Sequence, residues 1–265
     1  IGKRRADDVR NELIFEFPRF LRVVRSQAFL IENVPGLIGF QGGEKLDALL
    51  EKLADAGYQN ATYDVVDASA CGVPQRRKRV IIYGTLQGQT PSFEHLRRRL
   101  PTSPTVSDAF SDLPDPEIAA RRYPFGCRIP YESGAASEYA NLLRARSTKV
   151  ARWEPVAHSA RIVEAYRGVA QGGTEPSTKC WRLIENDLAR TLRAGSRTRT
   201  ACRPIHPTQA RVITVREAAR LHSFADRCVF PPRKSSAHVA IGNAVPPLMA
   251  EALARAFHGV VADDI

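Results

Sequence analysis

The sequence predicts an α/β protein in which part of a doubly wound sheet is joined to a smaller, irregular domain. Three observations support this fold class. Short apolar runs alternate with amphipathic helical segments in the first part of the chain. From about Gly84 to Arg203 this periodicity weakens, and Pro, Ser, Gly and Arg become frequent. Helical spacing then returns. We therefore expect residues 1–86 and 238–265 to form one domain and residues 87–237 the other.

The first elements are a helix and a buried strand. Apolar residues recur at near-helical spacing from Val9 to Val24, although Pro18 should kink or break that helix. The continuous apolar run Ala28 to Ile31 predicts a buried strand, and it ends abruptly in Glu32 and Asn33. Open α/β sheets bind ligands beyond the carboxyl ends of their strands. Glu32 is therefore a candidate catalytic or base-contacting group, with a simple helix cap or loop hydrogen bond as the alternative.

The next segments complete a helix between strands. Leu46 to Ala56 is amphipathic and closes at Gly57, a typical C-terminal signal. The sequence predicts two further strands, Tyr58 to Val66 and Arg79 to Tyr83. A helix that connects strands in this way is typical of an α/β layer.

Two helices are expected near the C-terminus. Thr214 and Glu217 have the spacing of a capping box ahead of a helix. A second helix should begin at Pro246-Pro247 and run to about Phe257, because proline suits the first turn.

Composition points to an anionic partner. Among the 265 residues, 39 Lys and Arg face 28 Asp and Glu, for a formal charge of +11, and a polyphosphate backbone is the first candidate. The five cysteines are scattered without metal-ligand or disulfide spacing. No apolar run reaches membrane-spanning length and no leader precedes the chain, which predicts a cytoplasmic protein. The first residue, Ile1, suggests a piece of a longer or processed chain.

The segment Gln75-Arg-Arg-Lys-Arg79 places four cations directly before an apolar strand. Strand alternation should put Gln75, Arg77 and Arg79 on one face. Cations this close repel unless acidic groups or phosphates neutralise them, and guanidinium forks suit phosphate oxygens and base carbonyls. Nucleic-acid binding is the favoured interpretation, and a solvated basic turn is the alternative.

A second basic stretch runs from Arg190 to Arg220, with Glu217 its only acidic residue. Interleaved Thr, Ser and Gly would let this backbone follow a phosphate chain, whereas a solvated loop is the alternative. Its arginines are Arg190, Arg193, Arg197, Arg199, Arg203, Arg211, Arg216 and Arg220.

The segment Ile241-Gly-Asn-Ala-Val-Pro-Pro247 puts a flexible glycine and an amide side chain at the mouth of a helix. Such a turn can present Asn243, Ala244 and Val245 to a ligand. The alternative is an ordinary helix N-terminus.

These pieces, taken in order, resemble the later motifs of the DNA cytosine-5 methyltransferase family. The matching segments are RNELIFEF from Arg10, ENV from Glu32, QRRKR from Gln75, RVITVREAARLHSF from Arg211 and IGNAVPP from Ile241. The resemblance covers both ends of the chain. It implies a Rossmann-like methyltransferase sheet, with a target-recognition domain in the variable middle.

The resemblance also implies a reaction on a flipped-out cytosine in duplex DNA, with S-adenosylmethionine as methyl donor. Glu32 would hold and protonate ring nitrogen 3, Asn33 would brace the loop, and Arg79 would bind the 2-carbonyl oxygen. Arg77 would support the pocket or touch phosphate. Residues expected to bind the DNA substrate are Gln75, Arg211 and Arg220; those expected to bind the cofactor are Asn243, Ala244 and Val245.

The sequence departs from the family pattern in what it lacks. The Pro-Cys loop that carries the nucleophile and the glycine-rich cofactor turn are absent, and Cys71 reads as a small buried residue. His222, Ala225 and Ala240 stand where the family usually has glutamine, proline and glutamine. We therefore expect a fragment or subunit that works with a missing N-terminal half. The alternatives are a non-catalytic DNA-binding remnant and a transfer-RNA methyltransferase.

Overall fold

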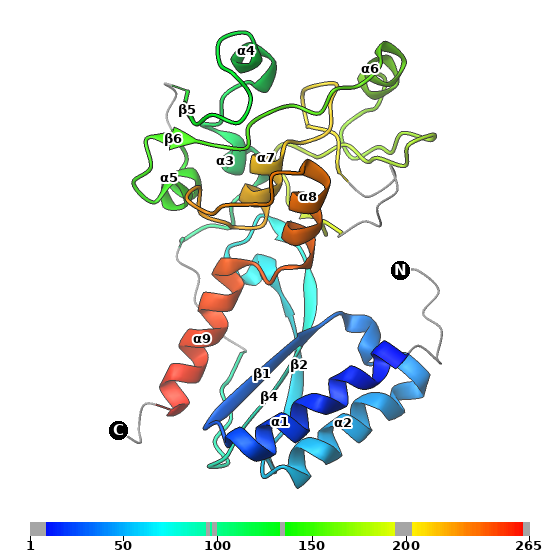
Figure 1. Cartoon of the computed structure of the whole chain (residues 1–265), viewed down its shortest axis with the longest axis vertical. Coiled ribbons are helices and arrows are strands. Elements are labelled where there is room, and N and C mark those ends of the chain that lie inside the picture. The colour runs from blue at the N-terminus through cyan, green and yellow to red at the C-terminus, as the bar shows by residue number, and fades with distance from the viewer. Residues whose placement is uncertain (1–8, 94–95, 97–99, 133–135, 194–202, 262–265) are drawn as a thin grey trace. The chain divides into compact units, whose positions relative to one another are not determined.

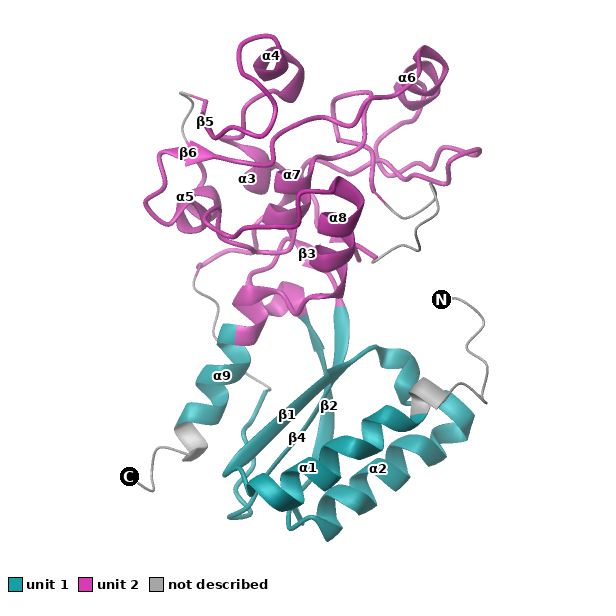
Figure 2. Cartoon of the chain, in the orientation of Figure 1, with its two compact units in different colours: residues 1–67, 78–97, 251–265 teal, residues 68–77, 98–250 magenta. Residues whose placement is uncertain are grey.

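The computed structural model of the chain describes residues 9–93, 96, 100–132, 136–193 and 203–261. The chain forms two compact units. Unit 1 contains residues 1–67, 78–97 and 251–265, and unit 2 contains residues 68–77 and 98–250 (Figure 2). The predicted functional domains, 1–86, 87–237 and 238–265, divide the chain at other positions and stay a prediction.

Unit 1 is built on a three-stranded sheet (Figure 1). The strands are β1 (Ala28–Asn33), β2 (Thr62–Asp67) and β4 (Lys78–Thr85), in the order β1-β4-β2. Because β4 is antiparallel to both neighbours, β1 and β2 run parallel to each other. All three predicted strands are present, but β2 begins at Thr62, because Tyr58 to Ala61 form the turn that follows α2. Strand β1 extends two residues further than expected, so that Glu32 and Asn33 lie in its last pairs.

Helices cover both faces of this sheet. On one face, α1 (Glu16–Val24) and α2 (Glu44–Asp55) pack over Phe29, Val80 and Ile82. On the other, Tyr83 contacts Phe257 of α9 (Pro247–Val261) at a ring-centroid distance of 6.2 Å. This arrangement confirms the α/β class. Short 3-10 helices complete the unit: η1 (Val9–Phe15), η2 (Pro35–Leu37) and η3 (Phe40–Gly43).

Pro18 does not break the first predicted helix where expected. The segment starts as the 3-10 helix η1 and continues as α1 from Glu16, which places Pro18 in the first turn of the α-helix. The first-turn N–H groups have no partner within a helix, so a proline costs little there.

The end of α2 matches its sequence signal. Gly57 adopts a left-handed φ of 107°, and its N–H donates to the carbonyl of Ala54 at 2.9 Å. The N–H of Tyr58 donates to the carbonyl of Leu53 at 3.1 Å. This pair of bonds satisfies the last carbonyls of the helix, and glycine adopts the required φ without strain.

Unit 2 is built from short elements, as the weak periodicity predicts. Strands β3 (Gln75–Arg76) and β7 (Ala189–Arg190) pair in parallel, and β5 (Ile129–Pro130) pairs with β6 (Lys149–Val150) antiparallel. The helices not expected from the sequence are η4 (Ala68–Cys71), α3 (Val106–Phe110), α4 (Pro116–Ala120), α5 (Glu138–Arg144), α6 (Ala160–Arg167) and α8 (Lys234–Asn243).

The predicted C-terminal helices are both present. Helix α7 (Val215–Leu221) begins at the capping box: the Thr214 hydroxyl accepts from the Glu217 N–H at 3.1 Å, and the Glu217 carboxylate accepts from the Thr214 N–H at 2.6 Å. Helix α9 begins at Pro247 as expected and continues past Phe257 to Val261. Within the described residues, no helix combines the length and apolar character that a membrane crossing requires.

Candidate functional site

Glu32 and Arg79 form an ion pair on one face of the sheet in unit 1. In the register of β1 and β4, Glu32 lies opposite Ile81, so Arg79 is its diagonal neighbour on the same face. The Arg79 Nε lies 2.6 Å from the Glu32 Oε1. The Arg79 side chain is 10% exposed and that of Glu32 is 20% exposed, while the Oε1 atom of Glu32 is itself buried. The sequence placed these two residues at one site, and the structure brings them together.

Burial and the neighbouring carboxylate have opposite effects on the pKa of Arg79. Burial lowers the pKa of Arg79, and the neighbouring Glu32 carboxylate opposes that shift. The Asn33 side-chain oxygen accepts from the N–H of Val34 at 2.8 Å. This contact links the Asn33 side chain to the chain where it leaves β1. Its role in bracing the loop stays a prediction.

Burial alternates along the Gln75-to-Arg79 segment as predicted. Gln75, Arg77 and Arg79 are buried, whereas Arg76 and Lys78 are exposed. Arg76 pairs with Asp187, with 2.7 Å between the Arg76 Nη2 and the Asp187 Oδ1. An aspartate of the protein therefore neutralises part of the positive charge of this segment, for which the sequence suggested phosphate as a partner.

Arg77 is a positioning residue within unit 2. It is 1% exposed, and its Nη2 donates to the carbonyls of Gly242 at 2.9 Å and Ala244 at 3.1 Å. Its Nη1 donates to the carbonyl of Leu192 at 3.2 Å. Of the two roles expected for Arg77, support for the pocket fits this geometry, because a guanidinium held by internal carbonyls does not reach a phosphate.

The Asn243 turn begins at the end of a helix that the sequence did not predict. Asn243 is the last residue of α8 and exposes its side chain, and Ala244 follows in extended conformation. The Ala244 carbonyl accepts from Arg77 and lies 2.9 Å from the Nε2 of His222. The turn therefore exposes the side-chain amide of Asn243, while Arg77 and His222 hold the backbone carbonyl of Ala244.

The structure corrects the expectation that Arg211 and Arg220 bind DNA. Arg220 is fully buried and donates to both Asp226 and Asp112, with the shortest contact to each at 2.6 and 2.7 Å. Arg211 is 2% exposed and makes a two-pronged ion pair with Glu217 at 2.6 and 2.8 Å. Guanidiniums saturated by buried carboxylates hold unit 2 together and are unavailable to phosphate.

The other described arginines of the basic stretch differ in exposure. Arg190 and Arg193 are exposed, and Arg190 stacks on the Trp181 ring at 5.5 Å. Arg216 is buried, and its Nη1 lies 3.4 Å from the Asp226 Oδ1. Arg197 and Arg199 lie outside the described residues.

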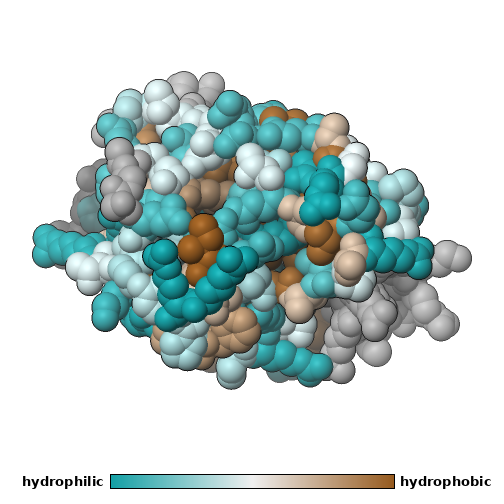
Figure 3. All heavy atoms as spheres, turned by 90° about the horizontal axis from the view of Figure 1, so that it is seen from above, coloured by the Kyte–Doolittle hydropathy of each residue, from teal (hydrophilic) through white to brown (hydrophobic). Residues whose placement is uncertain are grey.

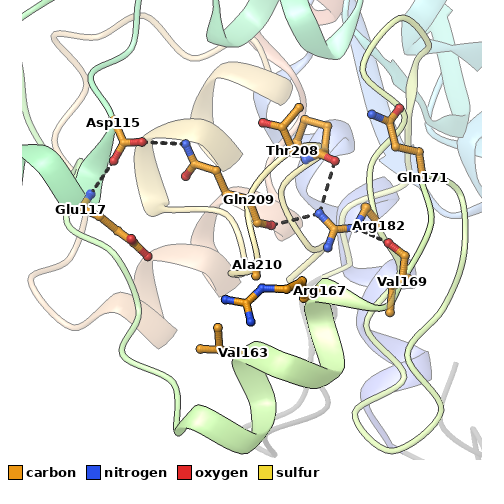
Figure 4. Close-up of a pocket in the computed structure, with 11 residues that line it drawn as sticks. Asp115, Glu117, Val163, Arg167, Val169, Gln171, Arg182, Thr208, Gln209 and Ala210 are labelled. Carbon is orange, nitrogen blue, oxygen red and sulfur yellow. Dashed lines mark hydrogen bonds between the residues drawn. The ribbon is translucent and has the colours of Figure 1, made fainter.

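A polar cavity of about 520 Å³ occupies another part of unit 2 (Figure 4). None of the predicted site residues lines it. Asp115 accepts from the Glu117 N–H and from the Gln209 side chain at 2.8 and 2.9 Å. Arg182 donates to five backbone carbonyls, among them that of Val169 at 2.7 Å. These polar groups are already satisfied by the protein, which indicates a structural cavity.

Sequence reasoning missed three residues that organise unit 2. Asp112 and Asp226 are the partners of Arg220, and nothing in the sequence distinguishes them from surface aspartates. His222 connects Gln75 to Ala244. Its position within the RVITVREAARLHSF segment, where the family usually has glutamine, was the available signal.

Known proteins resemble this chain over most of its length. The model of the family described as C-5 cytosine-specific DNA methylase matches residues 1–258. The Type II methyltransferase M.XorII of Xanthomonas oryzae pv. oryzae is 34% identical, over 96% of this chain and 63% of that protein. M.AgeI of Thalassovita gelatinovora is 30% identical, over 96% of this chain and 78% of that protein. The chain thus spans about three fifths of the length of M.XorII.

Solved structures show the same fold. A DNA modification methyltransferase encoded within an E. coli prophage superposes with a TM-score of 0.78 at 25% identity, over 97% of this chain and 76% of that one. The S. pombe Dnmt2 methyltransferase has a TM-score of 0.55 at 14% identity, over 96% of this chain and 74% of that one, which is a likeness of fold alone. From the family match over nearly its whole length, the chain belongs to the C-5 cytosine-specific DNA methylase family.

Proposed function

We propose that this chain takes part in methyl transfer from S-adenosylmethionine to carbon 5 of a cytosine flipped out of duplex DNA, with Glu32 and Arg79 holding the base. The observation that carries the proposal is the contact of a partly exposed carboxylate with a guanidinium at the carboxyl end of β1. Nitrogen 3 and the 2-carbonyl oxygen are neighbours on the cytosine ring edge. Adjacent acid and guanidinium groups can therefore contact both at once.

The chemistry explains why these two groups are needed. When a thiolate adds to carbon 6, the ring electron pair moves toward nitrogen 3 and the 2-carbonyl oxygen. A proton taken up between the Glu32 carboxylate and nitrogen 3 when the base binds passes to nitrogen 3, and Arg79 stabilises the charge that develops on the oxygen. Carbon 5 thereby gains the electron density to displace the sulfonium sulfur from the methyl carbon, and loss of its own proton to a base then expels the thiolate from carbon 6. Bound S-adenosylmethionine supplies the methyl as an activated sulfonium substituent.

Residues 243–245 are proposed to form one side of the cofactor site. Asn243 presents an exposed amide, which suits the polar groups of a nucleoside-bearing cofactor. Arg77 and His222 hold the adjoining Ala244 carbonyl.

The thiolate is proposed to come from a segment outside this sequence, on the same longer chain or on a separate subunit. Among the cysteines that the structure describes, Cys71 and Cys180 are buried and Cys127 and Cys228 are partly buried. Cys71 is 2% exposed, which fits a packing role. A nucleophile supplied by another segment would have to dock against unit 1.

Unit 1 offers a surface for that docking. Among the described residues, β1 pairs only with β4, so its other edge is open to a further strand. On α1, Phe20 is 57% exposed and Val23 is 81% exposed. An open strand edge and an uncovered apolar helix face both favour association with another protein segment.

Duplex DNA is the proposed substrate because the chain carries a net positive charge and part of its basic stretch is exposed. The chain carries a formal charge of +11, and Arg190 and Arg193 remain exposed in the basic stretch. On the face shown in Figure 3, hydrophobic residues form small separate groups among hydrophilic ones. Such a surface suits a polar partner, and the net positive charge of the chain favours an anionic one.

Methyl transfer by the chain joined to its upstream segment tests the proposal. Transfer of labelled methyl from S-adenosylmethionine to random-sequence duplex DNA is expected, with bisulfite sequencing showing the product at carbon 5 of cytosine. Glu32→Gln should lower the rate roughly 10²- to 10⁴-fold, because the amide cannot deliver the proton to nitrogen 3. The matched control is Glu164→Gln, an exposed glutamate paired with Arg167, which should leave the rate unchanged.

The competing functions give different results in the same assay. A non-catalytic DNA-binding protein would bind the duplex with steep salt dependence and show no transfer even when joined to a well-folded upstream segment. A transfer-RNA methyltransferase would label transfer RNA in preference to the duplex. Either result overturns the proposed function.

A further inference from the structure

The orientation of the Gln75 side chain is fixed by backbone partners in unit 2. Its Oε1 accepts from the N–H of Leu192 at 3.0 Å, and its Nε2 donates to the carbonyl of Leu221 at 3.1 Å. The flipped amide would place a donor against a donor and an acceptor against an acceptor. The amide nitrogen of Gln75 is therefore the group that faces His222.

This orientation determines which ring nitrogen of His222 carries the proton. The Nδ1 lies 3.1 Å from the Gln75 Nε2, which is a donor, so the Nδ1 must accept. The Nε2 lies 2.9 Å from the carbonyl oxygen of Ala244, which can only accept, so the Nε2 must donate. Both contacts are satisfied together only by the neutral imidazole with its proton on Nε2.

We propose that His222, in this single tautomer, is a positioning residue that relays the fixed orientation of Gln75 to the Ala244 carbonyl and so sets the turn that carries Asn243. His222 is fully buried, which keeps bulk solvent away from its ring nitrogens. The Ala244 carbonyl receives a second bond from Arg77, so two donors on different segments define its direction. The inference rests on the proposed function only where it names the cofactor as the ligand of the turn.

The relay accounts for histidine at a position where the family usually has glutamine. A glutamine side chain accepts through its oxygen and donates through its nitrogen, and the Nε2–H imidazole does the same with its two nitrogens. The Phe224 ring stacks on the imidazole at a centroid distance of 5.9 Å and an interplanar angle of 14°, which holds the ring plane. The two residue types are thus equivalent here in donor and acceptor pattern.

Nitrogen-15 NMR of the full chain, labelled at histidine, tests the tautomer directly. The His222 signals are identified by their loss in His222→Gln. They should show protonated Nε2 and unprotonated Nδ1 at neutral pH. A proton on Nδ1, alone or together with one on Nε2, would overturn the proposal.

Amide hydrogen exchange tests the consequence for the turn. The Ala244 N–H is bonded to the Ile241 carbonyl at 3.2 Å and reports whether the end of α8 stays closed. His222→Leu should speed its exchange about fivefold, as expected for one lost hydrogen bond, whereas His222→Gln should keep the wild-type rate. The control His258→Gln, at an exposed histidine of α9, should change nothing. An unchanged rate in the leucine variant, or no rescue by glutamine, contradicts the relay.

A separate measurement extends the inference to the cofactor. Binding of S-adenosylmethionine to the complete enzyme should weaken by about the same factor in His222→Leu and remain unchanged in His222→Gln. If the wild type binds no S-adenosylmethionine, the proposed function fails, while the tautomer and exchange results still decide the relay. Binding equally tight in the leucine variant would overturn the link between the relay and the cofactor.

Discussion

Arginine and carboxylate meet in both units of this molecule, with different consequences. In unit 1, Glu32 and Arg79 form one ion pair with a carboxylate that remains one fifth exposed. In unit 2, Arg220 lies fully buried between Asp112 and Asp226. The unit 1 pair is therefore the one that a ligand could reach from solvent, as the proposed function requires, whereas Arg220 and its two aspartate partners are fully buried. The difference lies in the number of partners and the burial of the pair, because the residue types are the same.

Further partners surround the two aspartates of the unit 2 cluster. The Tyr131 hydroxyl donates to the Asp226 carboxylate at 2.5 Å, and Arg144 also pairs with Asp112. Burial opposes the charge of Arg220, but its two carboxylate partners outweigh that and raise the pKa of Arg220. The desolvation cost of these charges is offset only while all partners are present.

The largest expected stability effect is therefore at Arg220. Arg220→Leu should lower the free energy of unfolding by about 3–5 kcal/mol, because Asp112 and Asp226 would be left as buried charges without their shared partner. Denaturant unfolding followed by circular dichroism measures this loss. Arg255→Leu is the matched control: it removes an exposed arginine paired with Glu251 and should change stability by less than about 1 kcal/mol. Equal losses of unfolding free energy in the two variants would show that the buried cluster stabilises the fold no more than the exposed pair does.

A smaller effect is expected from the acid titration of Glu217. Burial raises the pKa of Glu217, but the Arg211 guanidinium opposes and outweighs it, and the pKa falls to about 2 from an ordinary value of 4.5. A carboxyl whose folded pKa is depressed stabilises the fold above its unfolded pKa and loses that contribution as pH falls toward the folded value. Unfolding free energy should therefore drop by roughly 3 kcal/mol between about pH 5 and pH 2 through this group.

Glu217→Gln separates this contribution from that of other carboxylates. The variant should be less stable than wild type at neutral pH, and the difference between them should shrink as pH falls through this window. A gap that stays constant from neutral pH to pH 2 would show that Glu217 does not titrate as its surroundings dictate.

The smallest effect concerns the cap of α7. Thr214→Ala removes the hydroxyl that accepts from the Glu217 N–H and should cost about 1 kcal/mol, measured as a lower unfolding midpoint. Thr214→Ser keeps the hydroxyl and should recover most of the loss. Similar losses in both variants would mean that packing of the threonine methyl, not the cap, stabilises the helix start.

The sequence predicted the elements whose signals are local. The strands of unit 1, the Gly57 stop and the Thr214 capping box each depend on neighbouring residues, and all three are confirmed. Helix α8 was missed, since its apolar residues do not repeat at helical spacing and Gly242 near its end suggests a turn.

The contact between Glu32 and Arg79 was predictable because the two motifs that carry them lie on neighbouring strands. Glu32 and Arg79 meet because the two strands that carry them pair directly. The partners of Arg220 could not be foreseen: Asp112 is 108 residues away along the chain, and an arginine-rich segment reads the same whether its partner is phosphate or a buried aspartate. The relay through His222 depends likewise on Gln75, 147 residues distant.

The most direct test of the account is the unfolding free energy of Glu32→Gln, measured on the same preparation as its methyl-transfer rate. If the pair serves the base, the variant should unfold within about 1 kcal/mol of wild type, since glutamine still offers Arg79 an oxygen acceptor, while transfer falls at least about 10²-fold. A loss of several kcal/mol with an unchanged transfer rate per folded molecule would contradict it and place this pair with the structural ion pairs of unit 2.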